Sequence, residues 1–315
     1  MTDINPFKPG TDTRVLDLTP GLGTAYNFMN EFQNLGIANY NGLQTNLTKR
    51  SSGSRFGNTF FTLAYTWSHQ LDNESGYRQR NNFVPYYNHN QFYASGDADV
   101  RQFLALSGGW EMPFQKLTTH AGWLTKGWTL YPIVTYRSGF PLDVLAFGSG
   151  VEPSMSNPGP SGAGDPQVVR ADLVAPVQYL NAGAYRTVNS NSAGAQGGNY
   201  YFNPNSFSNA RAGNLNQELN QSTPVNPATL LNQFTYGTFG RNALHGPGAF
   251  NANLSLSKIF RVRESLELEL RADAFNIFNT VEFSNPDTNI GDPSFGQVSN
   301  TADPRIIQLA LHLKF

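Results

Sequence analysis

Hydrophobic and polar residues alternate along the last eleven positions of the chain, 305–315. From residue 307 onward, one parity of this segment is entirely apolar and consists of Ile307, Leu309, Leu311, Leu313 and Phe315. The other parity is mixed and includes Gln308, His312 and Lys314. A period of two predicts a β-strand with one apolar face. An apolar face of this length that ends on an aromatic residue is typical of a strand whose outer side meets lipid.

Six further segments alternate in the same way, each near the roughly 9–11 residues of a tilted membrane strand. They are 40–50, 58–70, 101–112, 128–138, 250–260 and 264–276. The pattern is weakest in the first of them. In the fourth, Pro132 removes a donor from the hydrogen-bond ladder, so we expect a β-bulge or a shifted boundary there. Together the seven segments predict an all-β protein, an antiparallel transmembrane β-barrel.

The links between these segments differ in length. Those at 51–57, 113–127 and 261–263 are short or moderate, whereas those at 71–100, 139–249 and 277–304 are long and rich in Gly, Pro and Asn. Bacterial outer-membrane barrels have short periplasmic turns and long extracellular loops. If Phe315 lies in the periplasm, every short link falls on the periplasmic side.

The same alternation divides the chain into four regions. Residues 1–39 are predicted to be an extracellular loop or a truncated barrel segment, and 40–138 to be the first four strands. Residues 139–249 are predicted to be a long extracellular loop, and 250–315 the last strands. A complete barrel has an even number of strands and starts in the periplasm. We therefore expect about seven to ten strands from the C-terminal part of a larger barrel, although a strand near 13–18 would restore an even count.

Two sets of side chains support the membrane interpretation. Rings at both ends of the predicted outer face form a candidate aromatic girdle: Phe61, Trp67, Trp110, Trp128, Tyr136, Phe250 and Phe260. On the opposite face of 264–276, four charged residues are predicted to line the lumen: Glu267, Glu269, Arg271 and Asp273. The alternatives are the aromatic core of a β-sandwich for the rings and the solvated face of a soluble sheet for the charges.

Composition excludes several function classes. Charged residues make up 14% of the chain, against roughly 25% in ordinary soluble domains. The net charge of -1 gives no footprint for nucleic acid. Without cysteine there are no disulfides or thiolate sites, and no catalytic, cofactor or metal motif is present. We therefore expect a protein that is not an enzyme and has no cofactor.

Several segments resemble a known family. They are 239–248 (FGRNALHGPG), 253–260 (NLSLSKIF), 270–279 (LRADAFNIFN) and 304–308 (PRIIQ), with 39–44 (NYNGLQ), 65–68 (YTWS) and 99–101 (DVR) upstream. These segments are similar to the C-terminal signature of TonB-dependent receptor-like outer-membrane proteins. The resemblance is closest to the Oar-like group with a carboxypeptidase-regulatory-like domain, of the acidobacterial type. It covers most of 39–315 outside the long loop.

The resemblance implies a barrel of about 22 strands, plugged by an N-terminal domain that is coupled to TonB. It also implies that the terminal apolar set ending at Phe315 is the signal for the barrel assembly machinery, and that the extracellular loops bind a large ligand such as a siderophore or an oligosaccharide. Met1–Pro6 lacks the features of a signal peptide, and we find no plug or TonB box. We therefore expect that the chain does not transport alone.

Two other interpretations stay open. The first is a self-contained small outer-membrane barrel, either porin-like or structural. The second is a secreted β-sandwich that binds carbohydrate, because aromatic residues lie among amides in 139–249, for example Tyr185 and Tyr200. The same composition also describes a mobile loop, which we favour.

Overall fold

The computed structural model describes residues 2–3, 30–31, 34, 36–54, 56–73, 75, 90, 93–114, 122–145, 170–190, 194–208, 238–263 and 266–315. Within these residues the chain is mostly antiparallel β-sheet, and its α-helix is the four-residue α1 (Gly122–Thr125). No described helix is long and apolar enough to cross a membrane. The possible strand near 13–18 lies outside the described residues.

One large sheet holds seven long strands in the order β16-β15-β14-β7-β6-β4-β3, with the short β5 (Ala94–Ser95) pairing with β4. The long strands are β3 (Ala38–Ser54), β4 (Gly57–Asp72), β6 (Gln102–Glu111), β7 (Trp128–Arg137), β14 (Ala249–Arg263), β15 (Leu266–Phe275) and β16 (Ile306–Lys314). Each corresponds to one predicted segment, and all pairs are antiparallel, which confirms the fold class. The sheet is not closed, and β3 and β16 are its edges.

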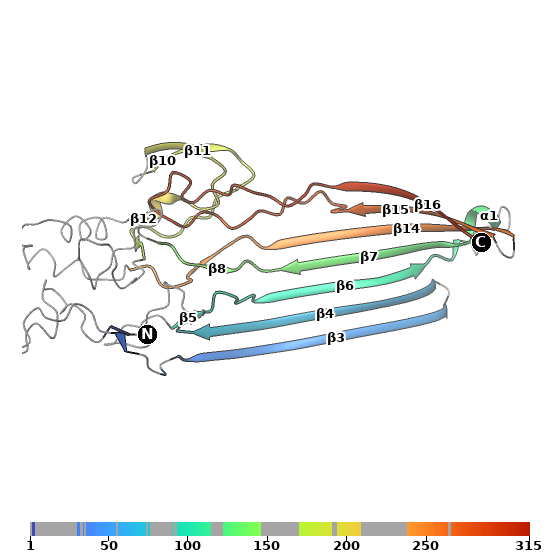
Figure 1. The fold of residues 1–315 in the computed structure, drawn as a ribbon, viewed down its shortest axis with the longest axis horizontal. Helices are drawn as coiled ribbons and strands as arrows, with labels where there is room; N and C mark the ends of the chain where they lie inside the picture. The colour runs from blue at the N-terminus through green and yellow to red at the C-terminus, as the bar shows by residue number, and fades with distance from the viewer. Residues whose placement is uncertain are drawn as a thin grey trace, which may run out of the picture.

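The two ends of the sheet differ, as Figure 1 shows. The β3–β4 and β14–β15 turns, α1 and the C-terminus lie at one end, which we call the turn end. The connections between β4 and β6, between β7 and β14 and between β15 and β16 lie at the other, which we call the loop end. The predicted grouping of short and long links is therefore present.

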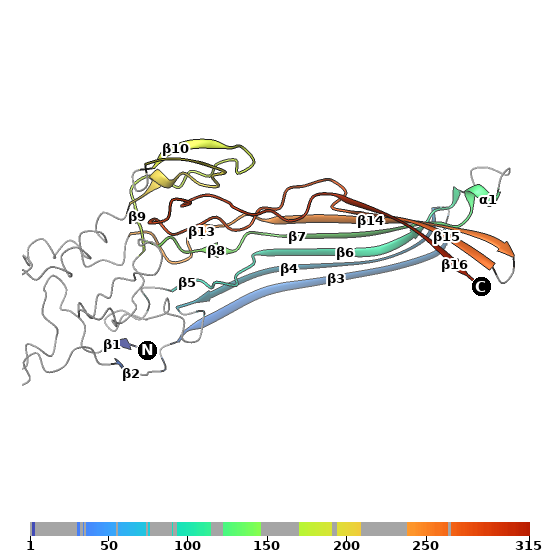
Figure 2. The same ribbon diagram turned by 45° about the horizontal axis from the view of Figure 1, so that its top comes forward.

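The loop end carries a folded unit, which we call the cap and which stands out in Figure 2. Its strands are β8 (Pro141–Leu142), β9 (Asp172–Leu173), β10 (Arg186–Ser190), β11 (Gly194–Gly198), β12 (Phe207–Ser208) and β13 (Leu244–His245), with the 3-10 helix η3 (Pro204–Ser206). Its buried core joins the β7–β14 and β15–β16 connections and contains Val144, Ala171, Phe202, Phe207, Phe239, Leu244, Ile290 and Phe295. The described part of 139–249 is thus packed structure, contrary to the mobile loop that we favoured. Two further short strands, β1 (Thr2–Asp3) and β2 (Asn30–Glu31), pair with each other.

The β-bulge expected at Pro132 is absent. Pro132 pairs with Leu254 in an unbroken β7–β14 register. On the other side, the β6–β7 ladder is interrupted between the Ser107–Ile133 and Trp110–Leu130 pairs and resumes in the same register. The missing N–H of Pro132 therefore removes local pairing to one neighbour without shifting the strand.

Candidate functional site

The strand register puts a continuous row of apolar residues from all seven long strands on one face. Directly paired residues of antiparallel strands point to the same side of a sheet. One row of such pairs runs through Leu47, Leu63, Leu106, Val134 and Ala252. On the other side of β14, the pairing of Leu254 with Ala274, and of Ala274 with Ile307, continues this face to β16. We call it the apolar face, and its opposite the polar face.

The predicted girdle residues all lie on the apolar face, divided by this row. On the turn-end side of this row lie Phe61, Trp110, Trp128 and Phe260. Their separation from the row along the strand increases from β4 to β14. Toward the loop end lie Trp67, Tyr136 and Phe250. Such a stagger is expected where strands tilt relative to the membrane normal. Contact of these rings with the membrane interfaces stays a prediction.

The terminal strand is the most exposed part of the apolar face. Its apolar residues range from 57% exposed at Leu313 to 99% at Phe315, with Ile307, Leu309 and Leu311 between these values. β16 pairs with β15, and within the described residues its other edge has no partner strand. An apolar strand with a free edge can be captured by strand addition. Recognition by the assembly machinery stays a prediction.

Comparison with known proteins agrees with this architecture. The family model described as "Outer membrane beta barrel domain" matches residues 1–308. The chain belongs to this family. The protein therefore belongs in the bacterial outer membrane, as predicted. Neither the curated proteins nor the solved structures that were searched gave a match.

The polar face of the barrel domain gathers the four charges predicted to line the lumen. Glu267 accepts a hydrogen bond from Arg261 Nε (3.1 Å). Glu269 binds Lys314 Nζ (2.8 Å) and the Ser257 hydroxyl (2.7 Å). Their position on one face agrees with the expectation, and their contact with the lumen stays a prediction.

The other two predicted charges form a similar pair. Arg271 Nε donates to the Asp273 carboxylate (2.8 Å), which also accepts a hydrogen bond from the Ser255 hydroxyl. The side chains of Arg271 and Asp273 are 46% and 15% exposed. Exposed pairs of this kind contribute at most about 1 kcal/mol each to stability. The four charged residues, which we call the charge ladder, therefore affect the charge of the polar face more than the stability of the sheet.

An apolar patch on the polar face was missed by sequence reasoning. Phe60, Phe103, Tyr131 and Ile133 are all 40–50% exposed and share this parity, with Phe103 nearer the loop end than the other three. Around Gly109 the rings of Phe60 and Tyr131 fill the space that a side chain would take, because an added Cβ would lie 2.5 Å and 3.1 Å from them. In the sequence, these apolar residues occupy the parity opposite to that of the leucines, and this pattern could have predicted the patch. A purely polar lumen does not account for it.

A buried ionic cluster, which we call the clasp, holds the cap to the strands. The Arg241 guanidinium, 3% exposed, binds the Asp72 carboxylate (2.7 Å) at the end of β4 and Asp97 (3.1 Å) beyond β5. Asn242 donates from its backbone to Asp143 (2.6 Å) and from its amide to Asp97 (2.7 Å). It adopts a positive φ of 52°, which asparagine tolerates better than most residues.

The clasp continues through Arg170, whose guanidinium binds both oxygens of Asp143 (3.0 and 2.9 Å). Arg241 and Asn242 belong to the FGRN stretch that carries the family resemblance. We used this stretch only for the resemblance and assigned no role to the two polar residues. The available signal was an arginine within an otherwise weakly charged segment.

A second polar cluster ties β4 to the segment before β6. The side chain of Asp99 is fully buried and accepts hydrogen bonds from the Gln70 backbone (2.8 Å), Arg101 Nε (2.7 Å) and His69 Nδ1 (3.1 Å). Burial alone would raise the pKa of the Asp99 carboxyl. The hydrogen bonds from Gln70 and Arg101, with the nearby Arg101 and His69 charges, outweigh burial and lower this pKa below its ordinary value.

The aromatic residues of the cap serve mainly its core. Phe202 and Phe207 contact each other edge-on, with centroids 5.5 Å apart, and Tyr200 is 1% exposed. Burial, with a smaller effect of Tyr179, raises the pKa of Tyr201 to about 12. Tyr185 is 74% exposed and is the candidate ring for ligand contact. Among the described residues, no group of three or more His, Asp or Glu side chains could hold a metal ion.

Proposed function

We propose that the chain is the C-terminal barrel portion of a TonB-dependent outer-membrane receptor for a large ligand, such as a siderophore or an oligosaccharide. In this proposal the apolar face meets lipid, the polar face lines the lumen, and the cap lies outside the cell. The chain requires the plug of the receptor and does not transport on its own.

The exposed patch of Phe60, Phe103, Tyr131 and Ile133 carries this proposal. A water-filled pore is lined by polar residues. Covering apolar rings on the lumen side with a folded domain lowers the free energy relative to leaving them in water. A plug seated against this face would cover the patch and pair with the charge ladder beside it.

Photo-cross-linking tests this arrangement. p-Benzoylphenylalanine replaces either Tyr131 on the polar face or its neighbour Leu130 on the apolar face, in protein within native outer membranes. A receptor predicts a peptide adduct from position 131 and lipid adducts from position 130. The absence of a peptide adduct from 131 in folded protein contradicts the plugged arrangement.

The porin-like alternative makes an opposite prediction about permeability. An unplugged small barrel should let arabinose enter proteoliposomes and cause rapid swelling, whereas a plugged receptor should not. Energy coupling is tested separately by formaldehyde cross-linking in intact cells. Recovery of TonB with the protein supports coupling, and its absence contradicts it.

A further inference from the structure

A cavity of about 560 Å³ lies at the turn end beside α1. Its walls come from α1 and the two residues that follow it, and from β14: Gly122, Trp123, Lys126, Gly127, Ile259, Phe260 and Arg261. The rings of Trp123 and Phe260 have centroids 6.3 Å apart. Because Phe260 lies on the apolar face, α1 stands over the turn-end border of that face. Figure 1 shows α1 at the same end of the sheet as the C-terminus.

A buried cation lies next to this cavity. Lys258 is 2% exposed and shares the apolar face with Trp128, its partner in β7. Its ammonium donates to the Lys126 carbonyl oxygen and lies 4.8 Å from the centroid of Phe260 and 5.5 Å from that of Trp128. The contacts that the structure records for this ammonium are a carbonyl and two ring faces, with no described carboxylate. The site therefore carries an uncompensated positive charge within the described residues.

The turn-end border of the apolar face carries positive charges on β3 and β14. Lys49 pairs with Phe61, Lys258 pairs with Leu270, and Arg263 pairs with Leu266, which puts all three on the apolar face. No Asp or Glu of the described long strands shares that face. Lys126 adds an exposed ammonium at the mouth of the cavity. Basic and aromatic residues at this depth suit lipid headgroups.

We propose that this cavity binds the headgroup phosphate of an anionic phospholipid in the membrane leaflet at the turn end. Lys126 contacts the phosphate, the buried Lys258 supplies a fixed positive charge behind it, and Trp123 packs against the glycerol region. The acyl chains then run along the apolar face. Charge selects an anion, and the position at the border of the apolar face selects a lipid over a soluble ion. The proposal does not depend on the receptor proposal.

Native mass spectrometry of the full chain, extracted from outer membranes in mild detergent, tests the site with added phosphatidylglycerol or phosphatidylcholine. Lys126→Gln is the test variant. Lys49→Gln is the matched control, because Lys49 lies on the same border outside the cavity. We expect one retained phosphatidylglycerol on the wild type and on Lys49→Gln, and about fivefold weaker retention on Lys126→Gln. Heat-modifiable migration on gels checks that each variant is folded.

Three results overturn the proposal. Equal retention by the wild type and folded Lys126→Gln removes the cavity from lipid binding. Equal retention of phosphatidylcholine and phosphatidylglycerol removes the charge selection. Displacement of the lipid by millimolar inorganic phosphate assigns the positive site to a free anion instead.

Discussion

Charged side chains of this protein lie in two contrasting settings. Arg241 and Asp72 are almost fully buried at 3% and 2% exposure, whereas the Arg261 side chain is 84% exposed beside Glu267. Removing one partner of a buried pair leaves an uncompensated charge, whereas an exposed pair is screened by water. The two arginines therefore make a natural comparison.

Arg241→Met should destabilise the cap by about 3–5 kcal/mol, because it leaves the Asp72 carboxylate buried without its arginine partner. Hydrogen exchange of the amides in β9 and β12 measures the effect. Arg261→Met is the control and should change the free energy of opening by less than about 1 kcal/mol. Similar effects from the two variants would mean that the clasp does not hold the cap.

Leu311→Arg should cost about 2–4 kcal/mol in unfolding free energy in lipid bilayers, because it puts a charge on the apolar face at mid-strand. His312→Arg is its matched control, because His312 pairs with Glu269 on the polar face and should tolerate a cation. Urea titration in liposomes measures both. Equal losses would contradict the assignment of the two faces.

Acid should weaken the contact between β4 and the segment before β6. Since the pKa of Asp99 is lowered in the folded protein, its carboxylate stabilises the fold above the unfolded pKa of about 4. This contribution is lost as the pH falls through the lowered folded pKa. The loss of stability measured by urea titration between about pH 5 and pH 2 should be smaller in Asp99→Asn than in the wild type. An unchanged pH profile would contradict this role.

At the scale of elements, the period-two pattern was sufficient to predict the seven long strands and their facing. Burial of one face fixes the register, because a slip by one residue would move every leucine to the opposite face of the sheet. Boundaries were less accurate, and β3 extends to Ser54 beyond the predicted end at residue 50 because its hairpin continues past a register shift. The terminal apolar set and the aromatic rows share the apolar face. Their partners in the membrane remain predictions.

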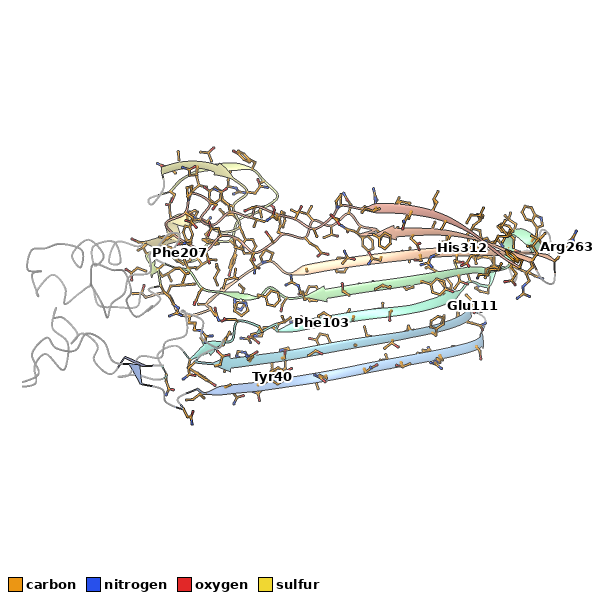
Figure 3. All side chains as sticks on the ribbon, viewed as in Figure 1. Tyr40, Phe103, Glu111, Phe207, Arg263 and His312 are labelled. Carbon is orange, nitrogen blue, oxygen red and sulfur yellow. The ribbon has the colours of Figure 1, made fainter. Side chains whose placement is uncertain are left out.

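The cap and the clasp could not be predicted in the same way. Strands such as β8, β9, β12 and β13 have two residues each, which is too short to show a period. The cap core combines residues from Val144 to Phe295, and pairing at such distances leaves no local pattern in the sequence. The patch at Phe60 and Tyr131 was missed because the leucine alternation dominated the same strands. Figure 3 shows Phe207 within the cap, away from His312 and Arg263 near the turn end.

The junction of the cap with β7 and β14 depends on two glycines in close approach. A Cβ added at Gly139 would overlap the Gly246 carbonyl oxygen, a backbone atom that cannot rotate away. Gly139→Ala should therefore cost about 1–3 kcal/mol or more, seen as faster hydrogen exchange in β8 and β13. Gly36→Ala is the control, because an added Cβ there meets nothing within 4 Å. Unchanged exchange in Gly139→Ala would show that the approach is not required.

At the scale of the whole molecule, the orientation in the membrane can be measured directly, because the chain has no cysteine. Single cysteines can replace Tyr185 in the cap and Ser52 near the turn-end terminus of β3, both of which are exposed. With the cap outside, a membrane-impermeant maleimide on intact cells should label position 185 and not position 52. After lysis both should react. Labelling of position 52 alone in intact cells would invert the orientation.

The clasp also has a consequence for the order in which the chain folds. The hairpins β3–β4, β6–β7 and β14–β15 join neighbours in sequence and can form early, since local contacts form fastest. Arg241 and Asp72 are separated by 169 residues, so their contact must wait for most of the sheet to be in place. The clasp is therefore expected to form late, after most of the strands have paired. A kinetic phase that Arg241→Met removes, while strand insertion proceeds at its normal rate, would be the signature of this step.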